Sequence, residues 1–203
     1  MCERAWSAGR STAKFWSATA TVPTGPSRSP DAPGPDQWNR AAREARGDIL
    51  AFLHADALVD AGWASAIVSA IADGAVGGWF QVEIVPESTS AVDAMGLRLM
   101  AAGINARTRL WQTATSDQCL FVRRETFEAI GGVPRLPLME GYELARRLRR
   151  AGPTAILDPH LRISGRRWER GGLVRTMCVM FLLRGAYIAG VDVDWLERIW
   201  NRV

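Results

Sequence analysis

An aspartate that follows a short apolar run is the first residue of this sequence that could bind a metal. Residues 49–53 are all apolar, and His54-Ala55-Asp56 follows them directly. Such a run is typical of a buried central strand in a parallel sheet, and α/β sheets bind ligands at the carboxyl ends of these strands. Asp56 could there hold Mg²⁺ or Mn²⁺ together with the phosphate oxygens of a substrate. A strand-end aspartate also caps helices or ends turns, so both uses stay open.

Two further clusters combine charged side chains in patterns that could serve a reaction. Glu140 and Glu143 stand at the amino end of an expected helix whose last turns, within residues 146–150, hold four arginines. This order of charges favours the helix dipole and allows ion pairs, so helix stabilisation alone would explain much of it. Arg166-Arg167-Trp168 places guanidinium groups beside an indole, as contact with a diphosphate or a sugar face requires. The alternative is a solvated basic loop with one packed tryptophan.

The elements that position these clusters alternate between strands and helices, which predicts an α/β sandwich. We expect strands at 49–53, 76–85, 118–122 and 154–157, and helices at 37–46, 61–72, 91–110, 125–130, 142–150, 173–189 and 194–200. In the helix at 91–110, an apolar stripe of Val92, Met95, Leu99 and Leu110 is expected to face the core, while Arg98, Arg107 and Arg109 stay solvated.

Size and composition favour a globular domain and argue against a nucleic-acid-binding protein. The chain has 203 residues, of which 48% are hydrophobic, and this suits one globular domain. Lys14 is the only lysine, so the net charge of +4 rests on arginine. Arginine suits the binding of phosphates or carboxylates, but a GC-rich genome also replaces lysine with arginine without a functional cause. No nucleic-acid-binding motif accompanies this charge, and we expect no nucleic-acid partner.

Cysteine usage and hydropathy predict a cytoplasmic protein. The three cysteines are widely spaced and form no zinc motif, which favours a reducing compartment. No stretch reaches the roughly 18 apolar residues that a membrane-spanning helix needs. The helix at 173–189 pairs an apolar face with Arg175 and Arg184, as interfacial helices do. Core packing is its expected use; peripheral contact with the inner face of the membrane is the alternative, which liposome flotation would test.

Taken together, these motifs resemble family 2 glycosyltransferases with the GT-A fold, and in particular the type 2 subgroup of selenodomain-associated transferases. The resemblance runs from about Gln37 to Trp200. It is carried, in order, by Gly47 to Asp56, by Asp117-Gln118-Cys119-Leu120-Phe121-Val122-Arg123-Arg124, by Pro137-Leu138-Met139-Glu140 and by Arg166-Arg167-Trp168. It implies a GT-A-like mixed sheet flanked by helices, without the first strands of the nucleotide-binding half.

The resemblance also implies a role for individual residues. Asp56 matches the last acid of the family's D-x-D-type motif, which holds a divalent cation, Mg²⁺ or Mn²⁺, on the nucleotide diphosphate, and His54 replaces the first acid. Asp117 and Gln118 match the acceptor-side pair. Arg166, Arg167 and Trp168 match a loop that is expected to close over the donor phosphates.

The implied reaction is a sugar transfer with inversion from a nucleotide-sugar donor to an unidentified sugar, lipid or small-molecule acceptor. A carboxylate deprotonates the acceptor hydroxyl, which attacks the anomeric carbon. The family carries this base in a Glu-Asp pair, but here Gly141 follows Glu140. Glu140 is therefore the expected base, and Glu143, one helical turn on, is the alternative.

The first 35 residues depart furthest from the resemblance. Family members begin with a strand, a helix and a second strand whose Asp-Gly-Gly-Ser-like turn binds the nucleoside, whereas residues 1–35 contain Val22 as their single branched aliphatic residue. We expect them to be disordered or non-native, through a frameshift or a misplaced start, and 36–203 to form a truncated GT-A domain. The domain is then either a transferase or a non-catalytic binding or scaffold domain. Upstream DNA without a displaced reading frame would argue against the frameshift.

Overall fold

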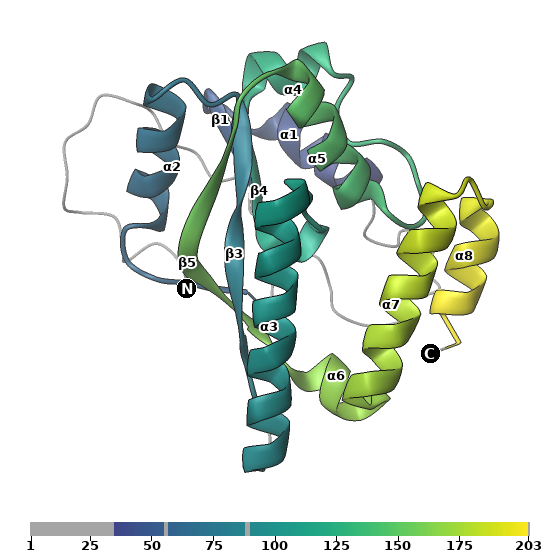
Figure 1. Cartoon of the computed structure of the whole chain (residues 1–203). Coiled ribbons are helices and arrows are strands. Elements are labelled where there is room, and N and C mark those ends of the chain that lie inside the picture. The colour runs from purple at the N-terminus through teal and green to yellow at the C-terminus, as the bar shows by residue number, and fades with distance from the viewer. Residues whose placement is uncertain (1–34, 55–56, 88–89, 203) are drawn as a thin grey trace.

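The computed structural model describes residues 35–54, 57–87 and 90–202, which form alternating helices and strands (Figure 1). In chain order these are α1 (Pro35–Glu44), β1 (Ile49–Phe52), β2 (Leu58–Val59), α2 (Trp63–Ala72), β3 (Gly77–Val85), α3 (Ala91–Trp111), η2 (Ser116–Gln118), β4 (Leu120–Arg123), α4 (Arg124–Ala129), α5 (Glu140–Ala151), β5 (Thr154–Ser164), α6 (Arg166–Gly171), α7 (Leu173–Ile188) and α8 (Val193–Trp200). The expected α/β class is confirmed. Residues 1–34, the first part of the segment expected to be disordered or non-native, lie outside the described residues.

The strands form one mixed sheet in the order β1-β4-β3-β5-β2. Among the described strands, β3 and β5 alone pair in parallel, and the other neighbours are antiparallel. The two faces of the sheet carry separate apolar clusters. One cluster packs the sheet against α2, α3 and α6, and the other packs it against α1, α4 and α5. The molecule therefore has helices on both sides of a central sheet.

The expectation of a central parallel strand at 49–53 was wrong. Among the described residues β1 pairs with β4 alone, antiparallel, from Ile49 opposite Arg123 to Phe52 opposite Leu120. All four of its residues are buried, because α1 covers one face and the α2–α3 layer the other. A continuous apolar run reports burial of both faces, and it carries no information on strand direction or on the position in the sheet.

Strand β5 is much longer than the expected 154–157. Beyond residue 157 it contains Asp158 and Arg162, which interrupt the apolar pattern from which strands are recognised. Both charges have partners: the carboxylate of Asp158 accepts a hydrogen bond from Gln81 at 2.9 Å, and Arg162 forms an ion pair with Asp60. Long-range polar pairing therefore extends this strand beyond what the apolar pattern indicates.

Helix α3 faces the sheet with a different side from the one expected. Val92, Met95, Leu99 and Leu110 are between 54% and 81% exposed, while Leu97, Met100, Ala101 and Thr108 are buried. Asn105 fixes this orientation, because its side-chain amide both donates to the carbonyl of Val82 and accepts from its N–H, each at 2.9 Å. The predicted stripe was wrong because a polar contact with an inner strand sets the rotation of the helix. The same rotation turns Arg107 toward the interior.

Arg123, the last residue of β4, and Arg124, the first of α4, fasten two helices to the sheet. Arg124 donates hydrogen bonds to the carbonyls of Ala42, Ala45 and Gly47 at 3.0, 2.8 and 2.8 Å, at and just beyond the carboxyl end of α1. Arg123 donates in the same way to Ile71 and Ala75, at the end of α2. Since the last carbonyls of a helix have no partner within it, this pair has a structural use.

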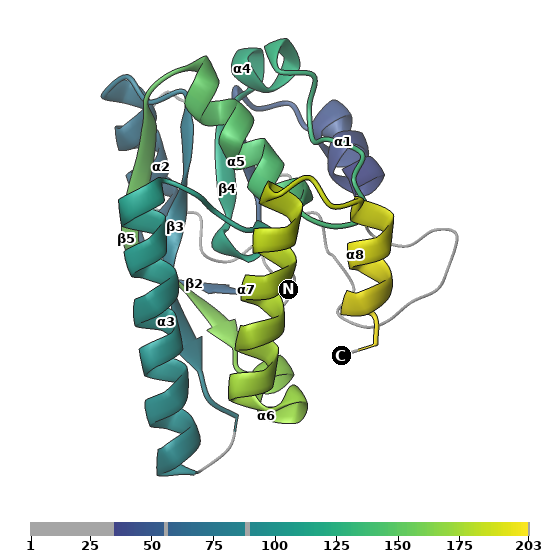
Figure 2. The same cartoon turned by 45° about the vertical axis from the view of Figure 1, so that its right-hand side comes forward.

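Helix α7 lies at the surface, beside α3 and α8 (Figure 2). It buries Thr176 and Leu183, but Val174, Phe181, Leu182 and Ile188 are between 58% and 72% exposed. Core packing therefore accounts for only part of its apolar surface. No helix within the described part of the chain is both long and apolar enough to cross a membrane. Peripheral membrane contact through α7 stays a prediction.

Candidate functional site

The short helix η2 and the first turn of α5 meet at the carboxylate of Glu140. The hydroxyl of Ser116 donates a hydrogen bond to this carboxylate at 3.1 Å. The next residue, Gly141, lies against the backbone of η2: a Cβ there would be 2.4 Å from the Ser116 nitrogen and 2.8 Å from its Cα. Only glycine fits this contact without a shift of the backbone. Gly141 therefore allows α5 to bring Glu140 up to η2.

Burial makes Glu140 a stronger base than an ordinary glutamate. Desolvation raises the pKa of its carboxyl, and the negative charge of Asp117 adds to the rise. A hydrogen bond from its own backbone, the hydrogen bond from Ser116 and the charge of His54 oppose it but do not cancel it. A carboxylate with a raised pKa, next to a second acid and an imidazole, is an arrangement found at catalytic sites.

Several buried polar atoms near Glu140 or its neighbour Asp117 have no hydrogen-bond partner among the described residues. They are Nε2 of His54, Oδ1 of Asp117, Nε of Arg107 and one terminal nitrogen, Nη2, of Arg184. A buried polar atom without a partner costs about 1–3 kcal/mol, so native proteins seldom gather them in one place without a reason. Their concentration around two neighbouring carboxyl groups, those of Glu140 and Asp117, indicates a site for a polar ligand.

The predicted residues His54, Asp117 and Glu140 are thus brought together. His54 reaches the site from the end of β1, where its ring lies edge-on to Trp38 at 6.1 Å. Asp117 comes from η2, and Glu140 begins α5. Three segments far apart in the sequence supply an imidazole and two carboxyl groups to one place.

Gln118 is also here, but its amide is used within the protein. Its nitrogen donates to the carbonyl of Phe80 at 3.0 Å and to the hydroxyl of Thr108 at 3.1 Å. Its oxygen accepts from the N–H and the hydroxyl of Thr115 and from Arg107. The side chain is fully buried and has no free hydrogen-bonding capacity. Gln118 therefore holds η2 in place, and its contact with an acceptor stays a prediction.

The segment expected to close over donor phosphates is helix α6 rather than a loop. The indole of Trp168 is 6% exposed and packs in the cluster between the sheet and α3. This burial fits the alternative of one packed tryptophan, and contact of Trp168 with the donor stays a prediction. Arg166 begins α6 and is half-buried, and the side chain of Arg167 lies outside the described part of the structure.

The predicted metal ligand, Asp56, also lies outside the described residues. Within 35–54, 57–87 and 90–202, no three His, Cys, Asp or Glu side chains gather as a metal site. His54, two positions before Asp56, supplies one candidate donor atom, its buried and unpartnered Nε2. Metal binding by Asp56 stays a prediction.

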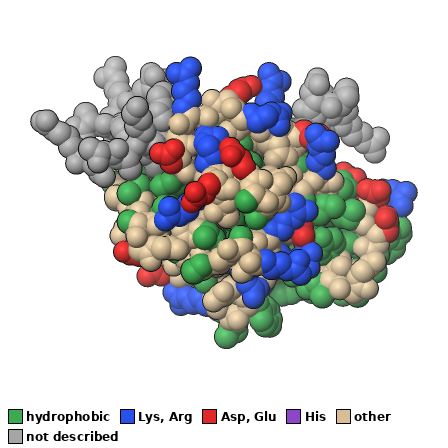
Figure 3. Space-filling model, turned by 90° about the horizontal axis from the view of Figure 1, so that it is seen from above, with side chains coloured by type: hydrophobic (Ala, Val, Ile, Leu, Met, Phe, Trp, Pro, Cys, Tyr) green, Lys and Arg blue, Asp and Glu red, His purple; other side chains and the backbone are tan. Residues whose placement is uncertain are grey.

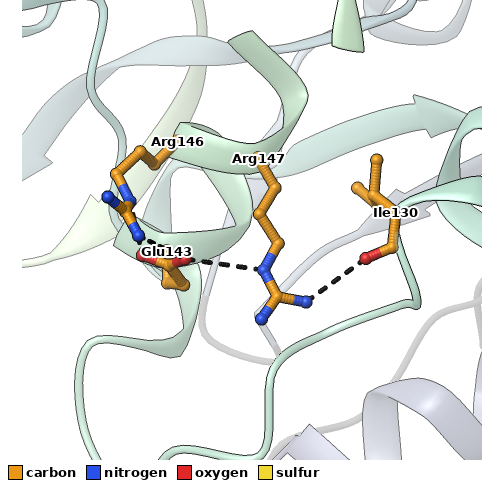
Figure 4. A network of polar contacts seen from close by, with 4 residues as sticks. All are labelled: Ile130, Glu143, Arg146 and Arg147. Atoms are coloured by element: carbon orange, nitrogen blue, oxygen red, sulfur yellow. Dashed lines mark hydrogen bonds and ion pairs between the residues drawn. The ribbon is translucent and has the colours of Figure 1, made fainter. Parts of the chain in front are cut away.

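Glu143, the alternative base, is held by two arginines (Figure 4). Arg146 binds both of its carboxylate oxygens at 2.7 and 2.9 Å, and Arg147 approaches at 3.5 Å while also donating to the carbonyl of Ile130. Burial alone would raise the pKa of Glu143, but the hydrogen bonds and charges of Arg146 and then Arg147 outweigh it, so the pKa is lowered. A paired carboxylate with a lowered pKa is a poor base, which leaves Glu140 as the candidate.

Replacing Glu143 with glutamine is expected to destabilise the fold by about 1–2 kcal/mol, because both arginines are partly exposed and lose less than a fully buried pair would. A carboxyl with a lowered folded pKa stabilises the native state above its unfolded pKa of about 4.3, and this stability is lost as the pH falls through the lower folded value. Chemical denaturation at pH 7 and below pH 3 measures the effect. A loss of stability equal at both pH values would contradict the ion-pair interpretation.

The site contains three residues that the sequence motifs did not indicate. Arg107 of α3 and Arg184 of α7 reach toward Asp117, and Arg184 stacks on the ring of Tyr142 with its guanidinium carbon 4.8 Å from the ring centre. One signal was present in the sequence: Arg184 interrupts the most apolar stretch of the chain, where a charge with no function is costly.

Residues 35–131 match the family model of glycosyl transferase family 2. The matched segment contains β1, His54 and Asp117, and the mixed sheet flanked by helices agrees with a GT-A-like fold. This match supports the family that the sequence motifs predicted. No curated protein matches the chain. The subgroup stays a prediction.

Proposed function

We propose that this chain transfers a sugar from a nucleotide-sugar donor to an acceptor hydroxyl, with inversion at the anomeric carbon, and that Glu140 is the base. The observation that supports this most is the Glu140 carboxyl itself, which is buried, bonded to Ser116 and raised in pKa beside Asp117 and His54. The match to a glycosyltransferase family gives the reaction class, and the site gives a residue able to accept the proton.

The proposed chemistry needs one proton acceptor and one leaving group. Glu140 takes the proton of the acceptor hydroxyl while the hydroxyl oxygen forms a bond to the anomeric carbon. The bond from that carbon to the diphosphate breaks on the opposite side, and its electron pair leaves with the nucleoside diphosphate. The hydrogen bond from Ser116 orients the carboxylate, and Asp117 disfavours a second negative charge nearby, which keeps Glu140 basic.

A divalent cation belongs to the proposal as a partner of the donor. When bound, it would neutralise the charge that develops on the departing diphosphate. The described residues supply one fitting group, the orphaned Nε2 of His54, at the end of the strand that leads to Asp56. His54 would help to hold and orient the donor and its cation at this position. Glu140 alone accepts the proton.

A non-catalytic binding domain is the rival function. It was favoured by Gly141, which stands where the family has an acid. The close approach of Gly141 to Ser116 gives this glycine a packing role, and the neighbouring Glu140 keeps the environment of a base. The transferase is therefore the better-supported of the two.

Nucleic-acid binding receives no support from the visible surface. On the face shown in Figure 3, arginine and acidic side chains are interspersed and form no continuous basic patch. Proteins that bind nucleic acid usually gather their basic charge on one face.

The test is a paired binding and turnover measurement on the whole chain. Uridine, guanosine and thymidine diphosphate sugars are each titrated by calorimetry with Mg²⁺ or Mn²⁺, and release of the nucleoside diphosphate is followed in the same mixtures. We expect at least one donor to bind in a metal-dependent way and to be consumed. Binding without release in any mixture would favour the rival, and the absence of both would refute the proposal.

A further inference from the structure

Two arginines from different helices meet beside Asp117. Arg107 lies near the end of α3 and Arg184 near the end of α7, and the two helices run side by side (Figure 2). Arg107 was expected to stay solvated, but it is largely buried, and so is Arg184. Charged side chains are rarely buried unless a partner compensates them.

Neither guanidinium is fully satisfied within the described part of the chain. Arg107 donates one hydrogen bond, to the oxygen of Gln118 at 3.1 Å, and its Nε has no partner. Arg184 lies over the ring of Tyr142, and its Nη2 has no partner. No carboxylate of the described residues lies within ion-pair distance of either group. Both arginines therefore have N–H donors that are available to a bound ligand.

The two positive charges also oppose each other. Burial and then the charge of Arg184 lower the pKa of Arg107 to about 10, against the weaker pull of Asp117 and Tyr142. Burial likewise lowers the pKa of Arg184. A bound anion would relieve both the desolvation and the repulsion, because guanidinium groups bind carboxylates and phosphates through paired hydrogen bonds.

The arginines and His54 come from different elements of the fold. Arg107 and Arg184 belong to α3 and α7, whereas His54 follows β1 and its ring lies edge-on to Trp38 of α1. His54 follows β1 and leads to the predicted metal ligand, so the donor diphosphate is expected there. The arginine pair is then left for the other substrate of the reaction, the acceptor.

We propose that Arg107 and Arg184 together bind an acidic group of the acceptor, a carboxylate or a phosphate, and so hold its hydroxyl near Glu140. Tyr142 supports Arg184 by stacking, and Gln118 supports Arg107 by its hydrogen bond. The assignment of the anion to the acceptor rests on the proposed function, whereas the existence of an anion site does not.

Ligand-detected NMR on the whole chain, in a buffer free of other multivalent anions, tests this inference. The probes are glycerol 3-phosphate and glucuronate, with glycerol and glucose as neutral counterparts. Each is measured with the unaltered chain, with Arg107→Gln and with Arg184→Gln. Arg98→Gln and Arg175→Gln, which alter exposed arginines on the same two helices, are the matched controls. Circular dichroism confirms folding, and Arg184→Gln is sufficient if Arg107→Gln does not fold.

We expect at least one charged probe to bind, its neutral counterpart to be rejected, and each of the two site variants to weaken binding by about tenfold or more. The controls should leave binding unchanged, and saturating uridine diphosphate with Mg²⁺ should not displace the probe. Equal binding by the site variants, or no binding of either charged probe, would overturn the anion site. Displacement by the nucleotide would assign the arginines to the donor instead. None of these outcomes requires sugar transfer, so they are separable from a failure of the proposed function.

Discussion

Replacing Glu140 with glutamine is expected to reduce sugar transfer by roughly two to four orders of magnitude and, at neutral pH, to make the folded chain more stable. Glutamine keeps the shape of the side chain and an oxygen that can accept the hydrogen bond from Ser116. It loses the ability to take a proton, and it no longer requires a negative charge to be buried. Transfer rates and chemical denaturation of the two proteins measure both effects.

The stability effect has a defined dependence on pH. Because burial raises the folded pKa of Glu140, the folded state holds its proton at pH values where the unfolded chain has lost it. The difference between the two proteins should therefore be absent below the unfolded pKa of about 4.3 and grow as the pH rises through the folded value. Glu125→Gln, at an exposed glutamate of α4, is the control and should show neither effect. A Glu140→Gln protein that transfers sugar normally would refute the assignment of the base.

Introducing an acid at position 141, where the family usually has one, is expected to damage the protein rather than improve it. The new Cβ of Gly141→Asp would collide with backbone atoms of Ser116, which cannot move aside as a flexible side chain would. Forced overpacking of this kind costs about 1–3 kcal/mol. The resulting shift of the backbone should also separate Glu140 from Ser116, and the rate of sugar transfer should fall as well as the stability.

Gly103→Ala is the matched control, because a Cβ at that position of α3 meets no atom within 4 Å. It should stabilise the helix by about 0.5–1 kcal/mol and leave transfer unchanged. Thermal unfolding and the transfer assay distinguish the two variants. A Gly141→Asp protein that is as stable as the parent and faster in transfer would show that the glycine is a lost catalytic acid and not a packing requirement.

The sequence predicted most of the elements because their local patterns are strong. The strand at the apolar run 49–53 and the helix at 142–150 both exist in the structure, with small shifts of their ends. The direction and position of β1 were not predictable, because burial on two faces looks alike in a central and an edge strand. The rotation of α3 was not predictable either, since it depends on a contact between Asn105 and Val82 across 23 positions.

The structure brings together three residues that the sequence predicted. His54 and Asp117 were predicted from the family resemblance, and Glu140 also from its place at the amino end of a helix. For Trp168 the sequence left open contact with the donor and packing in the core, because an indole beside two arginines looks the same in both cases, and the structure shows it packed. Arg107 could not be found, since its burial follows from the rotation of α3 and from the approach of α7, which no local pattern encodes.

The central claim is that Glu140 is a buried carboxyl with a raised pKa, and its titration can be observed directly. Carbon-13 NMR of glutamate carboxyls, compared between the parent chain and Glu140→Gln, isolates this one group. The account predicts one carboxyl that titrates clearly above the ordinary glutamate value of about 4.3 and disappears in the variant. If the signal lost in the variant titrates at or below that value, Glu140 is an ordinary carboxylate and the proposed base is wrong.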